Sequence, residues 1–166
     1  MRENPLVDIV CMAEGERTIV ELAHKLERNG DLHDVKGIAH RSGDHIKVNQ
    51  PRELIQNLDS LPFPARHLLP MDKYTVLGQE PSAGGIITSR GCPFQCVFCS
   101  SSLLSGKKFR ARSPKNVVHE IEHLRHYHGI SFVEFLDDLF TLDQERVVDI
   151  CKEIGRRHLD VEWVCS

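Results

Sequence analysis

The sequence lacks the features that would take a chain into a membrane, out of the cell or onto nucleic acid. No apolar run approaches the roughly 18 residues that a membrane-spanning helix needs, and the N-terminal Met-Arg-Glu-Asn-Pro has no apolar signal-peptide core. The formal net charge is only −3, so no general attraction to nucleic acid is expected. With 40% hydrophobic and 27% charged residues, the composition is that of a globular protein. We therefore expect a cytoplasmic protein with no membrane span and no nucleic-acid partner.

Three of the six cysteines lie within eight residues, as Cys92-Pro-Phe-Gln-Cys96-Val-Phe-Cys99. In a reducing compartment these thiols stay available to metal. Three thiolates on one short loop can wrap one metal centre, but they cannot complete the four-thiolate set of an ordinary electron-transfer iron–sulfur cluster. A four-iron cubane held in this way leaves one iron open. That iron can bind and activate a small molecule.

Other interpretations of the cysteines are weaker. A structural zinc site would need a fourth ligand and usually a second paired knuckle, and neither follows within reach on the sequence. A disulfide is weaker still, because nothing indicates secretion. The remaining Cys11, Cys151 and Cys165 fit apolar strand or helix faces, where we expect buried structural thiols.

Residues 1–49 predict a strand, a helix and a hairpin. The strand is expected at 7–11 and an amphipathic helix at 16–29. Hairpin strands follow at 35–41 and 45–48, joined by a turn at 42–44. Together they are too small for a domain and predict the tail of a doubly wound α/β domain. The helix places five apolar residues on or near one face: Ile19, Val20, Leu22, Ala23 and Leu26.

Residues 50–82 predict a linker, because five of the eight prolines fall there. The segment is too apolar for plain disorder, so we expect it to pack against a neighbouring domain.

Residues 83–166 show repeated βα units, which imply a parallel sheet with right-handed crossovers. The expected elements are strands at 85–91, 130–136 and 161–165 and helices at 113–128 and 143–158. The second helix is expected to pack through Val147, Val148, Cys151 and Ile154. The pattern predicts the first three βα units of a (β/α) barrel, whose chemistry lies at the carboxyl ends of its strands.

The barrel is unfinished, since a complete one needs about 200 residues or more. We therefore expect the 166 residues to be a piece of a longer protein. Alone, they should not turn over substrate, and exposed apolar edges should make them prone to aggregate.

The C-x3-C-x2-C spacing, with Phe98 just before the third cysteine, resembles the radical S-adenosylmethionine (SAM) enzymes. The resemblance extends over nearly the whole chain to the cobalamin-binding members of that family, which include methyltransferases acting on unactivated carbon and an oxidative ring cyclase of chlorophyll synthesis. It implies that a cobalamin-binding domain precedes a radical SAM barrel. The further matching segments are 7–16, 37–39, 58–64, 88–94, 112–114 and 135–138.

The resemblance also implies the cofactors. Cys92, Cys96 and Cys99 would ligate a [4Fe–4S] cluster whose open iron is chelated by SAM. One electron from the cluster would then cleave SAM to a 5′-deoxyadenosyl radical, for cobalamin-dependent methyl transfer or related radical chemistry. Cobalamin would be held mostly by residues outside this chain. The partners would be a flavodoxin- or ferredoxin-type reductant and a small-molecule or lipid-like substrate that the sequence does not identify.

Three further residues are implied to lie near SAM. Phe98 would lie near the adenine, and Asp137 or Asp138 would offer a carboxylate to the amine or ribose. For the aspartates, a solvated strand end or a helix cap is the alternative. For the chain as a whole, the alternative is a non-catalytic fragment that binds an iron–sulfur cluster or zinc.

Two other sequence patterns are typical of a metal site or an anion site. The segment 119–123 matches the H-E-x-x-H of zinc metalloproteases. At 100° per residue, however, His119, His123 and His126 lie opposite the apolar stripe of this helix, so we expect them to meet water and bind no metal. The basic run at 107–112, which includes Arg112, could neutralise a SAM carboxylate or a substrate anion, although a solvated loop is favoured.

Overall fold

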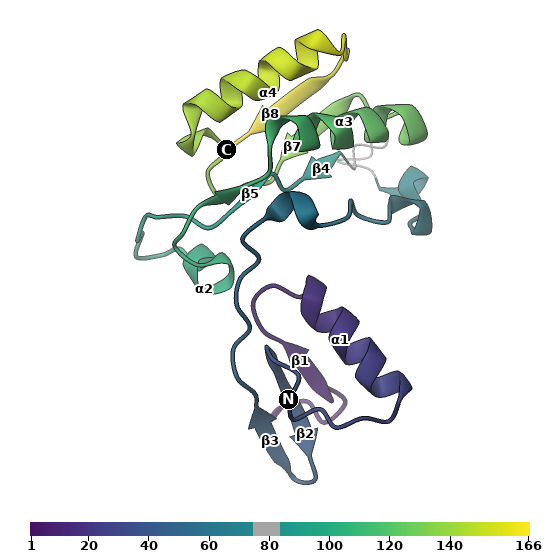
Figure 1. The fold of residues 1–166 in the computed structure, drawn as a ribbon, viewed down its shortest axis with the longest axis vertical. Helices are drawn as coiled ribbons and strands as arrows, with labels where there is room; N and C mark the ends of the chain where they lie inside the picture. Colours follow the sequence, from purple (N-terminus) through teal and green to yellow (C-terminus); the bar gives the residue numbers. More distant parts are fainter. Residues whose placement is uncertain (75–83) are drawn as a thin grey trace. The chain divides into compact units, whose positions relative to one another are not determined.

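The structure, a computed structural model, describes residues 1–74 and 84–166. The chain forms two compact units: unit 1 comprises Met1–Gln56 with Phe94–Lys107, and unit 2 comprises Asn57–Pro93 with Lys108–Ser166 (Figure 1). The cysteine loop therefore begins in unit 2 and continues in unit 1. The predicted domain limits at 49 and 82 stay a prediction. The end of the predicted linker, including Pro81, and the first residue of the predicted barrel lie outside the described residues.

Unit 1 contains the predicted strand, helix and hairpin. These are β1 (Ile9–Cys11), α1 (Glu16–Glu27), β2 (Ile38–Ser42) and β3 (His45–Val48), followed far along the chain by α2 (Ser101–Ser105). The sheet has the order β1-β2-β3 with both pairs antiparallel. Because Ser42 pairs with His45, the hairpin loop is Gly43-Asp44, one residue shorter than predicted. Asn29 adopts a positive φ of 50° after α1, as expected of the helix end.

The predicted apolar face of α1 is only in part a core face. Leu22 is buried with Val35 and Ile38, which form the small core of unit 1. The other four residues of the predicted face are not part of this core: Ala23 is exposed, and Ile19, Val20 and Leu26 are each more than half exposed. The buried line of the helix runs through Thr18 and Leu22, four residues apart, so side chains one or two positions away rotate outward. Leu26 continues that line by one turn but is exposed near the end of the helix. Cys11, predicted to be buried, is also exposed.

Unit 2 alternates strands and helices from residue 84 onward. Its three-stranded sheet has the order β4-β7-β8, and both pairs are parallel as predicted. The predicted strand at 85–91 is divided, because only its first part pairs with β7, whereas β5 pairs antiparallel with β6. The elements are β4 (Gly85–Ile86), β5 (Ser89–Arg90), β6 (Arg110–Ala111), α3 (Pro114–His128), β7 (Phe132–Phe135), α4 (Gln144–Arg156) and β8 (Glu162–Cys165), with short 3₁₀ turns at Leu58–Ser60, Arg66–Leu68, Met71–Lys73 and Phe140–Leu142.

Local capping residues mark the ends of the unit 2 helices. The Ser113 hydroxyl accepts a hydrogen bond from Asn116 N at 3.2 Å, and Gly129 ends α3 with a φ of 66°. Asp143 caps α4 by accepting from Arg146 N at 3.0 Å. In the part of the chain that the structure describes, no helix has the length and apolar character to cross a membrane.

The core of unit 2 lies between one face of the sheet and the two helices α3 and α4 (Figure 1). The Phe135 ring stacks on the Phe140 ring, with centroids 4.4 Å apart. The opposite face of the sheet is open, since Phe132 and Val164 are exposed. Within the described part of unit 2, ten apolar residues make up the core cluster: Ile86, Val117, Val118, Ile121, Leu124, Ile130, Val133, Phe135, Phe140 and Ile150.

The predicted core face of α4 is rotated from the observed one. Val147 and Ile154 are partly buried against the core, as predicted, but Val148 and Cys151 are exposed. The buried line instead runs through Arg146, Ile150 and Glu153, at helical spacing. Its two charged members are accommodated because Arg146 donates to backbone carbonyl oxygens and Glu153 accepts from Arg156 and Arg157. Cys165 is only half-buried.

Candidate functional site

The cysteine loop presents free thiols. All six cysteines of the chain are free; Cys92 is half-buried, and Cys96 and Cys99 are exposed. Cys99 N donates to Cys96 O at 3.1 Å, which makes a tight turn between these two residues. The Phe98 side chain inside that turn is 90% exposed. The loop therefore has both thiols and an aromatic ring available to a ligand.

The joint role of the three thiols stays a prediction from their spacing. Within 1–74 and 84–166, no three His, Cys, Asp or Glu side chains are gathered into a metal-binding group. Cys92 belongs to unit 2, whereas Cys96 and Cys99 belong to unit 1, so the loop connects two separately packed parts of the chain.

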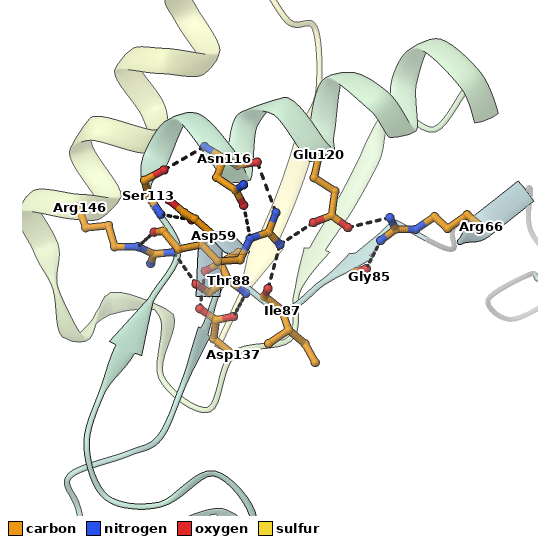
Figure 2. A network of polar contacts seen from close by, with 11 residues as sticks. Asp59, Arg66, Gly85, Ile87, Thr88, Ser113, Asn116, Glu120, Asp137 and Arg146 are labelled. Carbon is orange, nitrogen blue, oxygen red and sulfur yellow. Dashed lines mark hydrogen bonds and ion pairs between the residues drawn. The ribbon is translucent and has the colours of Figure 1, made fainter. Parts of the chain in front are cut away.

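Asp137, at the carboxyl end of β7, is neither a solvated strand end nor a helix cap. Its side chain is only 4% exposed. One carboxylate oxygen accepts from Thr88 N at 2.5 Å, and the other accepts from Thr88 Oγ1 at 2.5 Å and Ser89 Oγ at 2.6 Å. Figure 2 shows the carboxylate of Asp137 turned toward Thr88. Its neighbour Asp138 is exposed.

Thr88 is held from its other side as well. Its carbonyl oxygen accepts from Arg112 N at 2.9 Å and from Arg146 Nη2 at 3.0 Å. Arg146 Nε also donates to Arg112 O at 3.0 Å, and its guanidinium lies over the Phe140 ring. Burial lowers the pKa of Arg146, while the carboxylates of Asp137 and Asp143 oppose that shift. Every polar atom of Thr88 is thus engaged.

Glu120 joins two arginines in the same network (Figure 2). It is 1% exposed, and its two oxygens lie 2.7 Å from Arg66 Nη1 and 2.5 Å from Arg112 Nη1. Arg66 also donates to Gly85 O, and Arg112 donates to Ile87 O. The preference for a solvated loop is therefore wrong for Arg112 and also for Arg110, which is 4% exposed, whereas Lys107 and Lys108 are exposed as predicted. Glu120 is the acidic residue of the H-E-x-x-H match, and its carboxylate is already paired with two cations.

The histidines of α3 differ in exposure. His119 and His126 are exposed, as predicted. His123 is half-buried, with its ring 6.2 Å from that of Phe63 and 4.5 Å from that of Tyr127, so it meets water only in part. Phe63, from the proline-rich segment, covers this side of the helix. Burial lowers the pKa of His123, and the neighbouring His128 lowers it further.

Sequence reasoning missed most of this network. Thr88, Ser89, Arg66, Glu120 and Arg146 were assigned no role. The available signal was positional, because two hydroxyl residues directly precede the Arg-Gly-Cys that opens the loop.

Comparison with known proteins identifies the family. Residues 86–166 match the family model of the Radical SAM superfamily. Over 166 residues, all of this chain and 36% of the relative, the sequence is 44% identical to an uncharacterized methyltransferase of Pyrococcus horikoshii. It is 31% identical over 167 residues to the anaerobic magnesium-protoporphyrin IX monomethyl ester cyclase of Rubrivivax gelatinosus, covering 98% of this chain and 30% of the cyclase. The chain belongs to the radical SAM superfamily, as its cysteine spacing predicted.

Solved structures share the mixed α/β fold. The radical SAM methyltransferase TsrM from Kitasatospora setae, solved with tryptophan substrate and a SAM analog, aligns with a TM-score of 0.68 at 20% identity over 91% of this chain and 29% of TsrM. The cobalamin-dependent SAM radical enzyme OxsB, solved with aqua-cobalamin, aligns with a TM-score of 0.71 at 21% identity over 93% of this chain and 22% of OxsB. The chain thus spans about a third or less of the length of these relatives.

Proposed function

We propose that this chain carries the cluster-binding part of a cobalamin-dependent radical SAM enzyme, with Cys92, Cys96 and Cys99 as the ligands of a [4Fe–4S] cluster. The observation that carries the proposal is the C-x3-C-x2-C loop, which follows the parallel strand β4 and then the short antiparallel strand β5. The donor set fits the cluster, because the three thiols are free and thiolates are its usual ligands. A bound cluster would supply the electron for reductive cleavage of SAM at its open iron.

The residues near SAM are Phe98 and Asp138 in this proposal. The exposed Phe98 ring is available to stack against or flank an adenine. Asp138 is exposed just beyond β7, where barrel enzymes hold their ligands, and can accept hydrogen bonds from the amine or ribose of SAM. Asp137 is the less suitable of the two predicted aspartates, because both of its oxygens already accept hydrogen bonds from Thr88 and Ser89.

The proposal also assigns the two parts of the chain to the two domains of such an enzyme. The parallel strands β4, β7 and β8 supply the first three strands of the barrel, and the open face that carries Phe132 and Val164 is its inner wall. Residues 1–49 are the tail of the cobalamin-binding domain. The relatives named as methyltransferases favour methyl transfer, driven by a flavodoxin- or ferredoxin-type reductant in the cytoplasm.

Anaerobic reconstitution with iron and sulfide tests the proposal. The 166-residue chain should take up roughly four iron and four sulfide per molecule, with an oxygen-sensitive brown absorbance. A variant with Cys92, Cys96 and Cys99 all replaced by Ser should take up none. Stoichiometric zinc in place of iron in the purified chain would support the structural zinc alternative and contradict the proposal.

A further inference from the structure

The two residues that lead into the cysteine loop are fixed on all sides. Thr88 and Ser89 are buried, and they precede Cys92 by four and three positions. The backbone N, the hydroxyl and the carbonyl oxygen of Thr88 and the hydroxyl of Ser89 all have hydrogen-bond partners. All of these residues belong to unit 2. The loop therefore starts from a rigid point in the structure.

We infer that Asp137 is a positioning residue that holds the start of the cysteine loop and does not itself bind the cofactor. The inference rests on the proposed function, because it concerns the loop that would carry the cluster. Asp137 comes from the end of β7, the strand that pairs with β4, so its hydrogen bonds tie the end of one strand to the beginning of the loop. Hydrogen-bonded partners behind metal ligands commonly fix the geometry of those ligands.

The chemistry of the contact requires a carboxylate. All three partners point a donor at Asp137, and the Thr88 N–H cannot act as an acceptor. An alanine at 137 would leave these donors unpaired in a buried place, which is costly and loosens the segment. An asparagine would keep one acceptor oxygen, but its NH₂ group would force the hydroxyls to turn and accept. The stability of the segment around Thr88 and Ser89 should therefore decrease from the carboxylate of Asp137 to the amide of Asp137→Asn and then to the methyl group of Asp137→Ala.

The backbone transmits this constraint toward Cys92. Gly91 has a φ of 87°, a conformation that glycine adopts without strain. It turns the chain between Cys92 and the two hydrogen-bonded residues Thr88 and Ser89. Because Thr88 O remains bonded to Arg112 N and Arg146 Nη2 when the Asp137 side chain is removed, the local fold keeps a second attachment. The effect of the substitution should therefore concentrate on the start of the loop.

Cluster retention tests the inference. Asp137→Ala should lose its reconstituted cluster to an iron chelator several-fold faster than the wild-type chain. The effect should be below the roughly 10- to 100-fold loss that follows removal of a group bonded to a metal ligand itself, because Asp137 bonds Thr88 and Ser89 and not Cys92. Asp137→Asn should fall between Asp137→Ala and the wild-type chain. Ser89→Ala removes one donor and leaves the carboxylate in place, so it should give a smaller change in the same direction. It also serves as the test variant if Asp137→Ala does not fold.

Two controls separate positioning from general stability. Ile150→Val trims the core of unit 2 far along the chain from the loop, and Asp160→Asn removes a carboxylate that is 98% exposed. Both should lose the cluster at the wild-type rate, even where Ile150→Val lowers the melting temperature as much as Ser89→Ala. Hydrogen exchange in the cluster-free chain should show faster exchange at Thr88 N in Asp137→Ala alone.

The outcomes distinguish the two proposals. If the wild-type chain takes up iron but Asp137→Ala and Ser89→Ala lose it no faster than Ile150→Val, the positioning role is overturned while the proposed function stands. If the wild-type chain takes up no iron, the proposed function fails, and the positioning role fails with it. Wild-type uptake with selective loss in the Asp137 and Ser89 variants supports both.

Discussion

Units 1 and 2 differ in how much of their apolar surface they bury. Among the described residues, the core cluster of unit 2 contains ten buried apolar side chains, whereas that of unit 1 contains three, Leu22, Val35 and Ile38. Unit 1 also leaves large apolar side chains exposed on α1 and on the segment that carries Phe98 and Leu103. Because hydrophobic stabilisation is roughly proportional to the apolar area removed from water, unit 2 should be the more stable of the two. Thr88 and Ser89, which lead into the cysteine loop, belong to unit 2.

The largest effect that would sharpen this comparison is expected from Phe135→Ala. Phe135 is buried, stacks on Phe140 and has its ring 5.4 Å from that of Trp163. Its truncation should lower the free energy of unfolding of unit 2 by about 4 kcal/mol. Hydrogen exchange measured peptide by peptide should show the change in unit 2 and leave β1 to β3 as in the wild-type chain. Equal acceleration in both units would contradict their independence.

A slightly smaller loss is expected from Glu120→Gln. The substitution removes the buried charge shared by Arg66 and Arg112 and leaves two guanidinium groups facing a neutral amide. The cost should be about 3 kcal/mol in urea unfolding of unit 2. The matched control is Glu122→Gln on the same helix, whose half-exposed carboxylate pairs with Arg157, and it should cost about 0–1 kcal/mol. If the two variants lost similar amounts of unfolding free energy, the buried ion pairs of Glu120 would stabilise unit 2 no more than the half-exposed pair of Glu122.

The smallest effect concerns pH. Hydrogen bonds from Arg156 and Arg157 lower the pKa of Glu153 from an ordinary 4.5 to about 2. A depressed carboxylate pKa gives stability that is fully present above the unfolded-state pKa and is lost as the pH falls through the folded one. The stability advantage of the wild-type chain over Glu153→Gln should therefore be constant above about pH 5 and vanish toward pH 2. A difference that does not change across this range, followed by urea unfolding, would count against the assigned pairing.

Periodicity and turn chemistry allowed most of unit 2 to be predicted. Ser113-Pro114 and Gly129 mark the ends of α3 because caps are local signals. The pairings of Arg66 with Glu120 and of Asp137 with Thr88 could not be predicted, because they join residues far apart in the sequence. The same limit explains Cys151, which fits an apolar face by composition but lies one position beyond the buried Ile150.

The cysteine spacing contributed more to the family assignment than the fold did. Three thiols in eight residues predicted the radical SAM family before any tertiary contact was considered, and the family match over residues 86–166 confirmed it. The fold added the hydrogen bonds from Thr88 and Ser89 to Asp137 just before the loop. It also showed that Asp137 is buried, whereas Asp138 is exposed. Sequence patterns report residues that are close along the chain, whereas the structure reports the partners that hold them.

The most direct test of the central claim is cluster assembly in six single Cys→Ala variants of the chain, each reconstituted anaerobically and analysed for iron and sulfide. Loss of cluster assembly is predicted for the variants at Cys92, Cys96 and Cys99, and wild-type uptake for those at Cys11, Cys151 and Cys165. If any of the last three proved as necessary as the loop cysteines, a fourth thiolate would complete the ligand set. The open-iron account of this chain would then be contradicted.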